Sequence, residues 1–204
     1  MQIILASTSQ YRKQLLQNIG ISAQCIGSQV DEEAIVGKNP VETSQLRARA
    51  KAKNVAKMLS EKTVDFETSV VIIGADQVVY IDQELYGKPR DPKEWTKRLH
   101  KFSGREHQLT TSVSLWGYGT SFSRKPQELR LFSEHTRIHF RDLQHSEIDK
   151  YVQLGEAKNC AGGYMIEGYG ASLIKRIDGD YQNVIGLPIF SLLRELRDLG
   201  FYIL

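Results

Sequence analysis

Cysteine is scarce in this chain of 204 residues, which has only Cys25 and Cys160. Two cysteines so far apart in the sequence indicate neither a disulfide scaffold nor a zinc site, and we expect both to be small packing residues. Long apolar runs are missing too, since no stretch reaches the length that spans a bilayer. The segment Met1–Ala6 is too short and uncharged for a signal peptide, so we expect a cytoplasmic protein with no membrane partner.

A strong excess of charge of one sign is also absent. The chain has 27 Lys and Arg against 24 Asp and Glu, a net charge of +3. The basic residues are scattered among acidic ones and form no stripe with aromatic residues, so we expect no nucleic-acid partner. Strong salt dependence of oligonucleotide binding would indicate otherwise. The mildly basic balance is compatible with a small anionic substrate.

Helical and extended patterns alternate along the chain, which predicts an α/β fold with a long twisted mixed sheet flanked by helices on both faces. Hydroxyl residues at 7–9 precede a helix that Gly20 ends, and Pro40 opens a long helix with Leu46 on its apolar face. Ser146 is expected to cap a later helix. No sharp boundary divides the sequence. We therefore expect residues 1–204 to form a single domain, either undivided or as two lobes around a central cleft.

An aspartate follows the most hydrophobic run of the chain, Val70–Ala75. We expect the run to be a buried strand that ends at Asp76. A carboxylate beside so apolar a run is unfavourable unless a cation, a metal or hydrogen bonds satisfy it. Because ligands of α/β proteins gather at the carboxyl ends of strands, Asp76 is the first candidate for a functional site. Its simpler role would be to cap a turn.

The segment Leu5–Arg12 leads a strand directly into a hydroxyl-rich helix N-terminus. Such an N-terminus offers backbone N–H groups and a positive dipole end to an anion, and Arg12 adds a phosphate ligand. The alternative for Ser9 and Arg12 is an ordinary helix cap with a surface arginine.

Three other charged residues are candidates for the same site. Lys51 lies on the long helix, and its alternative is a solvated helix face. Lys88 stands between Gly87 and Pro89, a rigid turn that would aim the side chain. Glu32 lies in an acidic loop that either holds a divalent cation or stays hydrated.

Taken together and in this order, these segments resemble the Maf family of nucleotide pyrophosphatases over nearly the whole chain. The motifs that carry the resemblance are Leu5–Arg12, Asp31–Glu32, Lys51, Gly74–Asp76, Gly87–Pro89, Ser103–Gly104 with His107, Ala161–Tyr164 and Gly186–Pro188. The resemblance implies a fold shared with inosine-triphosphate pyrophosphatases, hydrolysis of a nucleoside triphosphate to monophosphate and pyrophosphate, a divalent cation (Mg²⁺ or Mn²⁺) and a homodimer.

The resemblance also implies roles for single residues. Asp76 would be the catalytic acidic residue, and Glu32 and Asp76 would bind the metal. Ser9, Arg12, Lys51 and Lys88 would surround the phosphates. Carboxylate oxygens with water and phosphate are the ligands that Mg²⁺ and Mn²⁺ prefer, which agrees with these roles. The sequence leaves open whether Asp76 is the general base or a metal ligand.

Three positions depart from the commonest family pattern: Tyr11, Gln77 and Glu167. They resemble the subfamily that acts on 7-methyl-GTP, although that subfamily more often has Trp at the position of Tyr11. An aromatic ring attracts the cationic 7-methylguanine, and a carboxylate accepts both donors of a guanine edge. We therefore expect 7-methyl-GTP as substrate. The alternatives are dTTP and UTP, or a nucleotide-binding regulator of cell division without turnover.

Overall fold

The computed structural model describes residues 1–61 and 68–204, and within them seven strands form one sheet. The path through the sheet is β2-β1-β3-β5-β6-β7, and β4 pairs with β3 outside this path. The β2, β1 and β3 strands are parallel, and the remaining pairs are antiparallel. The strands are β1 (Gln2–Leu5), β2 (Ala23–Cys25), β3 (Val70–Ile81), β4 (Glu84–Leu85), β5 (Glu106–Tyr118), β6 (Gln127–Phe140) and β7 (Ile174–Asp178).

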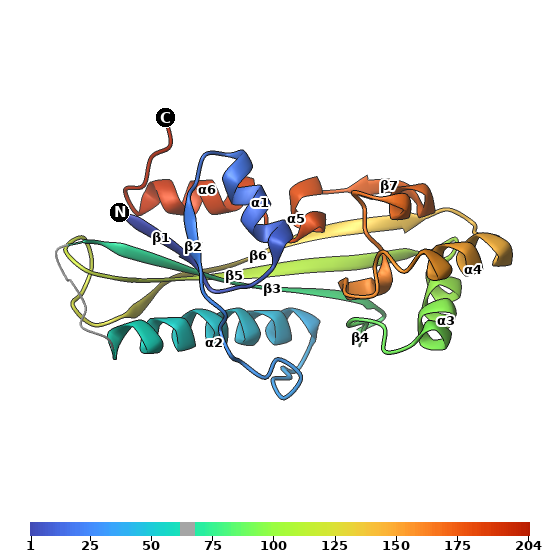
Figure 1. Ribbon diagram of the computed structural model, residues 1–204, viewed down its shortest axis with the longest axis horizontal. Coiled ribbons are helices and arrows are strands. Elements are labelled where there is room, and N and C mark those ends of the chain that lie inside the picture. Colours follow the sequence, from blue (N-terminus) through green and yellow to red (C-terminus); the bar gives the residue numbers. More distant parts are fainter. Residues whose placement is uncertain (62–67) are drawn as a thin grey trace.

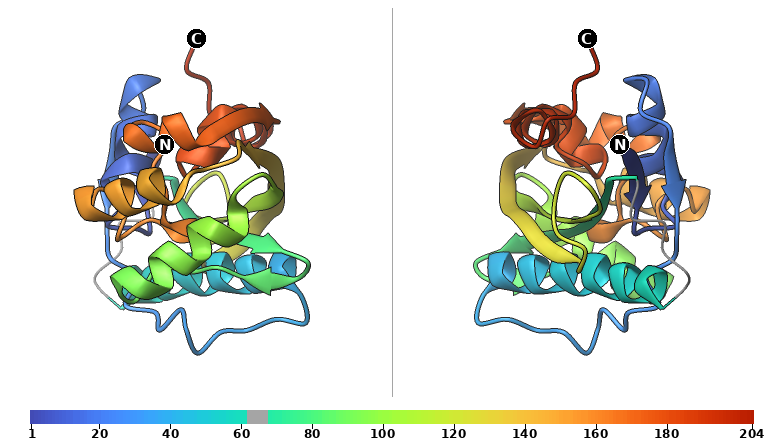
Figure 2. Two further views of the ribbon diagram at one scale, coloured as in Figure 1. Left: turned by 90° about the vertical axis from the view of Figure 1, so that its right-hand side faces the viewer. Right: turned by 90° about the vertical axis from the view of Figure 1, so that its left-hand side faces the viewer.

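Helices cover both faces of this sheet, which confirms the predicted architecture. In Figure 1, α2 runs along one face, and α1, α5 and α6 lie on the other. The end-on views of Figure 2 show the same layers. None of the described helices is long and apolar enough to cross a membrane. The helices are α1 (Gln10–Asn18), α2 (Pro40–Ser60), α3 (Pro92–Phe102), α4 (His145–Leu154), α5 (Tyr181–Ile185), α6 (Ile189–Asp198) and two 3₁₀ turns, η1 (Ala161–Gly163) and η2 (Tyr169–Leu173).

Local signals place most helix ends correctly. Ser9 caps α1 and accepts a hydrogen bond from the Arg12 N–H, and α2 begins at Pro40. The prediction that Ser146 caps α4 is wrong, because Gln144 forms a capping box there with Glu147. The prediction that Leu46 faces the core is also wrong, since this side chain is exposed on α2. Small residues such as Ala48 and Ala52 pack against the sheet instead.

The β3 strand does not end at Asp76 as predicted but continues to Ile81. One edge of β3 pairs with β5 along residues 70–80. The other edge pairs with β1 only from Val70 to Ile73, and with β4 only at Tyr80 and Ile81. Asp76 therefore lies in the middle of a long strand, beside a stretch of edge that β1 leaves open.

Gly74 allows α2 to approach β3 closely at this open stretch. A Cβ atom at Gly74 would lie 2.3 Å from the carbonyl oxygen of Ala48 and 2.7 Å from the backbone nitrogen of Ala52. No side chain larger than hydrogen fits between the strand and the helix at that distance. The close approach brings Lys51 of α2 next to Asp76, two residues after the glycine on the same face of β3.

Candidate active site

A cavity of about 850 Å³ lies along the open edge of β3. The β1–α1 segment, the loop after β2, α2, the Lys88 turn and the segment 159–167 all contribute to its lining. Because β3, Leu109 and residues 184–186 also line it, eight separate parts of the sequence converge on this cavity. All nine predicted site residues line it: Ser9, Tyr11, Arg12, Glu32, Lys51, Asp76, Gln77, Lys88 and Glu167.

Lys51 joins the two predicted metal ligands. Its Nζ lies 2.8 Å from Asp76 Oδ1 and 2.8 Å from Glu32 Oε2. Asp76 and Lys51 are buried, with relative exposures of 3% and 5%, whereas the Glu32 side chain is 47% exposed. A buried ammonium and a buried carboxylate are stable together because each neutralises the other. Asp76 Oδ2 is also buried, and no described residue donates a hydrogen bond to it.

The two carboxyl groups have pKa values that move in opposite directions. Burial raises the pKa of Asp76 above its ordinary value, and the charges of Lys51 and Arg12 offset only part of this effect. Burial also acts to raise the pKa of Glu32, but the charge and hydrogen bond of Lys51 outweigh it, so this pKa is lowered. Asp76 is therefore the stronger proton acceptor of the two carboxylates.

Arg12 is held against the edge of β3 by backbone carbonyls. Its Nη1 donates to Ala75 O at 2.8 Å, and its Nε donates to Gly186 O at 2.9 Å. The Ala75 carbonyl is left without a strand partner because β1 has ended, so the arginine satisfies it. Nη2 has no protein acceptor among the described residues, which leaves this end of the guanidinium for a ligand.

The N-terminus of α1 and Lys88 complete the positive part of the cavity. Residues 7–12 line it, so the first turn of α1 and its positive dipole end face the same space as Arg12. Ser9 accepts the Arg12 N–H at 3.4 Å and also lines the cavity, so it is both a cap and a wall residue. Lys88 lines the cavity from the turn after β4 and is exposed.

The three residues expected to read the base lie in two groups. Tyr11 donates its hydroxyl to Met165 Sδ at 3.2 Å, and the charge of Glu167 is one of the causes that raise the Tyr11 pKa, after burial and Cys160. Gln77 instead donates its amide nitrogen to Asn183 O at 2.7 Å and to Thr111 Oγ1 at 3.2 Å. Both amide hydrogens are therefore used within the protein, and Gln77 has only an acceptor, Oε1, to offer a ligand.

Several lining residues were not predicted as site residues. Met165 and Cys160 line the cavity near Tyr11, and Cys160 also packs against a hydrophobic core cluster, as predicted. Cys25 is exposed, so the prediction that it is a packing residue is wrong. Tyr164 also lines the cavity. Its hydroxyl forms a hydrogen bond with the buried His107, whose Nε2 lies 2.8 Å away. Burial lowers the pKa of His107 to about 3, so this histidine is a neutral structural support.

Comparison with known proteins identifies the family of this chain. A family model described as Maf-like protein matches residues 2–199. The chain belongs to the Maf family. The family predicted from the sequence motifs is therefore confirmed, and the match extends over all the residues that line the cavity.

Curated members of the Maf family cover almost the whole chain. The dTTP/UTP pyrophosphatase of Aquifex aeolicus (strain VF5) is 37% identical over 200 residues, which cover 98% of this chain and 96% of that protein. The dTTP/UTP pyrophosphatase of Geobacillus sp. (strain WCH70) is 39% identical and covers 98% of each chain. At the level of the family, the predicted enzyme class, a nucleoside triphosphate pyrophosphatase, is confirmed. These relatives bear the name of the pyrimidine alternative and not of the 7-methyl-GTP subfamily.

Solved structures give weaker matches than the curated Maf proteins. A Ham1 protein of Staphylococcus aureus is 18% identical, covers 70% of this chain and 73% of its own, and has a TM-score of 0.41. A nucleoside-triphosphatase / dITP/XTP pyrophosphatase of Mycobacterium abscessus is 14% identical, covers 98% of each chain and has the same TM-score of 0.41. These scores are too low to add to the assignment.

The donor set of this Maf cavity fits a hard divalent cation. Glu32 and Asp76 supply carboxylate oxygens, and the buried Oδ2 of Asp76 lacks a partner among the described residues. No group of three or more His, Cys, Asp or Glu able to hold a metal ion occurs in residues 1–61 and 68–204. Mg²⁺ and Mn²⁺ accept such a site, because they commonly use one or two carboxylates with water and substrate phosphates.

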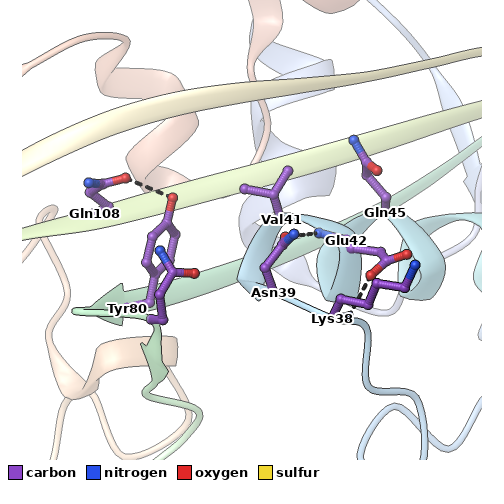
Figure 3. Close-up of a pocket in the computed structure, with 8 residues that line it drawn as sticks. Lys38, Asn39, Val41, Glu42, Gln45, Tyr80 and Gln108 are labelled. Atoms are coloured by element: carbon purple, nitrogen blue, oxygen red, sulfur yellow. Dashed lines mark hydrogen bonds between the residues drawn. The ribbon is translucent and has the colours of Figure 1, made fainter.

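A second hollow, of about 550 Å³, lies near the N-terminus of α2 (Figure 3). Its wall is polar, with Tyr80 donating to Gln108 and Asn39 accepting the Glu42 N–H. None of the nine predicted site residues lines it, and its charged side chains are Lys38 and Glu42 alone. The first cavity is therefore the candidate active site of this Maf protein.

Proposed function

We propose that this Maf protein hydrolyses dTTP and UTP to the nucleoside monophosphate and pyrophosphate. The observation that carries the proposal is the convergence of Asp76, with its unpartnered buried oxygen, on a cavity that also contains three basic side chains and a helix N-terminus. Curated relatives named dTTP/UTP pyrophosphatase support the choice of substrate, and their alignments with this chain cover at least 95% of each relative.

The reaction adds negative charge to the phosphate groups as water attacks the α-phosphorus and pyrophosphate leaves. Arg12, Lys88 and the N-terminus of α1 supply fixed positive charge for those oxygens. Asp76, whose pKa burial raises, is suited to hold the proton that the attacking water loses. Glu32 and Asp76 are also the residues that would hold Mg²⁺ or Mn²⁺, which supplies further charge neutralisation and a more acidic water molecule when bound.

Gln77 supports a pyrimidine substrate. Because its amide nitrogen is used by Asn183 and Thr111, Gln77 offers a single acceptor. Uracil and thymine both present a single donor, N3–H, between two carbonyl oxygens. Gln77 Oε1 can accept the N3–H of either base.

The second candidate substrate is 7-methyl-GTP, which was the preferred prediction from the sequence. Tyr11 and Glu167 favour it because they lie near each other on one wall of the cavity. An aromatic face and a carboxylate together suit a cationic purine with two adjacent donors. The names of the curated relatives favour the pyrimidine substrates instead.

The proposal is tested by comparing turnover of UTP by the wild-type protein and by the Asp76→Asn variant, with Mn²⁺ or Mg²⁺ present. We expect the variant to lose activity by about 10²–10⁴-fold, because the amide neither accepts the proton nor binds the cation well. The fold should persist, since the two side chains have similar volume. The matched control is Asp149→Asn, at an exposed residue of α4, and it should keep full activity. Near-normal turnover by Asp76→Asn would exclude the assigned role, and nucleotide binding without turnover by wild type would favour the regulator.

The proposal includes a cytoplasmic location and a homodimer, both expected from the sequence. Sedimentation of the purified protein tests the second expectation. A monomer at all accessible concentrations would contradict it.

A further inference from the structure

The ammonium of Lys51 is surrounded by oxygen atoms of this protein. An ammonium group has three N–H donors. Its Nζ lies 2.8 Å from Glu32 Oε2, 2.8 Å from Asp76 Oδ1 and 3.3 Å from Ala75 O. Three oxygen atoms of this protein therefore lie around the ammonium, and two of them belong to the predicted metal ligands.

These contacts compete with the predicted contact between Lys51 and a phosphate group. To move onto a phosphate oxygen, the ammonium must leave at least one of these oxygen atoms. The Glu32 contact is the easiest to release, because Glu32 is half exposed and lies in the loop between β2 and α2. Complete departure of the ammonium would leave two carboxylates near each other without the cation that neutralises them, which is unfavourable for Asp76 in its buried position.

A divalent cation between the same two carboxylates would remove that conflict. It cannot share the position with the ammonium, because both groups are positively charged and both use Asp76 and Glu32. Arg12 adds a further positive charge close to Asp76. The ligand-free arrangement therefore disfavours a metal ion, and the arrival of triphosphate oxygens reverses the balance by giving Lys51 new acceptors and the metal ion new ligands.

We infer that Lys51 is a resident counter-ion, which occupies the cation position between Glu32 and Asp76 until a nucleoside triphosphate draws it onto phosphate. The divalent cation and the nucleotide then bind cooperatively, and the protein alone holds the cation weakly. The inference rests on the proposed function for the identity of the nucleotide, but the exchange between Lys51 and a cation concerns only residues of this chain.

The test measures binding of Mn²⁺ to the protein without nucleotide, by the electron paramagnetic resonance signal of free Mn²⁺ at mildly alkaline pH. Lys51→Met removes the ammonium and keeps a chain of similar length. We expect it to bind Mn²⁺ at least about 10-fold more tightly than wild type, since two carboxylates lose their competitor. Lys53→Met, on the exposed face of the same helix, makes the same change of net charge and should leave Mn²⁺ affinity unchanged.

Two further variants keep the inference testable if Lys51→Met is unstable. Lys51→Gln is the polar substitute and should show the same direction of change. Adding Glu32→Gln to either variant should abolish the gain, which assigns the Mn²⁺ to these two carboxylates. No gain in either folded Lys51 variant, or a gain that survives Glu32→Gln, would overturn the inference.

Wild-type protein provides the complementary measurement, binding of a non-hydrolysable UTP analogue with and without Mn²⁺. Cooperative binding requires that Mn²⁺ raises the affinity for the analogue, at least about 10-fold in the expected case. Independent binding would overturn the inference. These results are separable from the proposed function: if wild type hydrolyses no nucleotide but Lys51→Met gains Mn²⁺ affinity, the exchange stands and the proposed function fails. If hydrolysis is present without that gain, the exchange fails and the function stands.

Discussion

Glu167 is the residue on which the choice of base depends most. It is exposed at the cavity wall, and no described residue donates a hydrogen bond to its carboxylate. A free carboxylate accepts donors from a guanine edge but faces two carbonyl oxygens in uracil or thymine, which it repels. With a pyrimidine substrate, Glu167 therefore weakens binding of the base when it lies close to these carbonyl oxygens.

This repulsion gives a prediction for Glu167→Gln. An amide can donate to a pyrimidine carbonyl, so we expect kcat/KM for UTP to rise relative to 7-methyl-GTP by about 10-fold, the size of one polar mismatch. Paired kinetics on the two nucleotides measure the ratio. Glu33→Gln, an exposed change outside the cavity lining, is the control. An unchanged ratio would show that Glu167 does not contact the base.

Individual site residues could be found from the sequence, but their hydrogen bonds could not. Residue type and motif order identified nine side chains that the fold gathers at one cavity. The motifs did not indicate that Gln77 donates its amide N–H to Asn183, 106 residues away, or that the Lys51 ammonium lies between Glu32 and Asp76. Such contacts depend on how α5 and α2 pack on the sheet, which residue type does not specify.

Elements were predictable where the signal is local, as with Ser9 and Pro40 at helix starts. The end of β3 was not, because an aspartate after an apolar run resembles a strand end. Its continuation to Ile81 depends on pairing with β5, a contact distant in sequence. The sequence also contained no signal for the short helix α5, because five residues carry too weak a periodic pattern.

The packing of α2 on β3 predicts the effect of Gly74→Ala. The new Cβ would overlap Ala48 O and Ala52, so α2 must move away and carry Lys51 from Asp76. We expect a loss of about 1–3 kcal/mol in the free energy of unfolding, as for other overpacked sites, together with reduced turnover. Denaturant unfolding and pyrophosphate assays measure the two effects. Gly87→Ala, where a Cβ meets no atom within 4 Å, should keep its stability, and equal losses in both variants would contradict the packing account.

At the scale of the whole molecule, the long strands β3, β5 and β6 extend along the length of the sheet (Figure 1). One hydrophobic cluster includes Leu99 of α3, a second includes residues of α1 and α6, and a third includes residues of α2. The cavity lies between these clusters along β3, where β1 stops. We propose that residues 1–204 act as one domain for this reason, because its three longest strands belong to both halves.

The composition of the cavity predicts the reaction of the whole protein, and one measurement tests it most directly. Products are quantified after incubating wild-type protein and Mn²⁺ or Mg²⁺ with UTP, dTTP and 7-methyl-GTP. We expect monophosphate and pyrophosphate in equal amounts, with a higher kcat/KM for UTP and dTTP. Preference for 7-methyl-GTP would keep the reaction and reverse the base assignment. Release of nucleoside diphosphate and inorganic phosphate would contradict the proposed function. Absence of product from all three nucleotides would contradict it too.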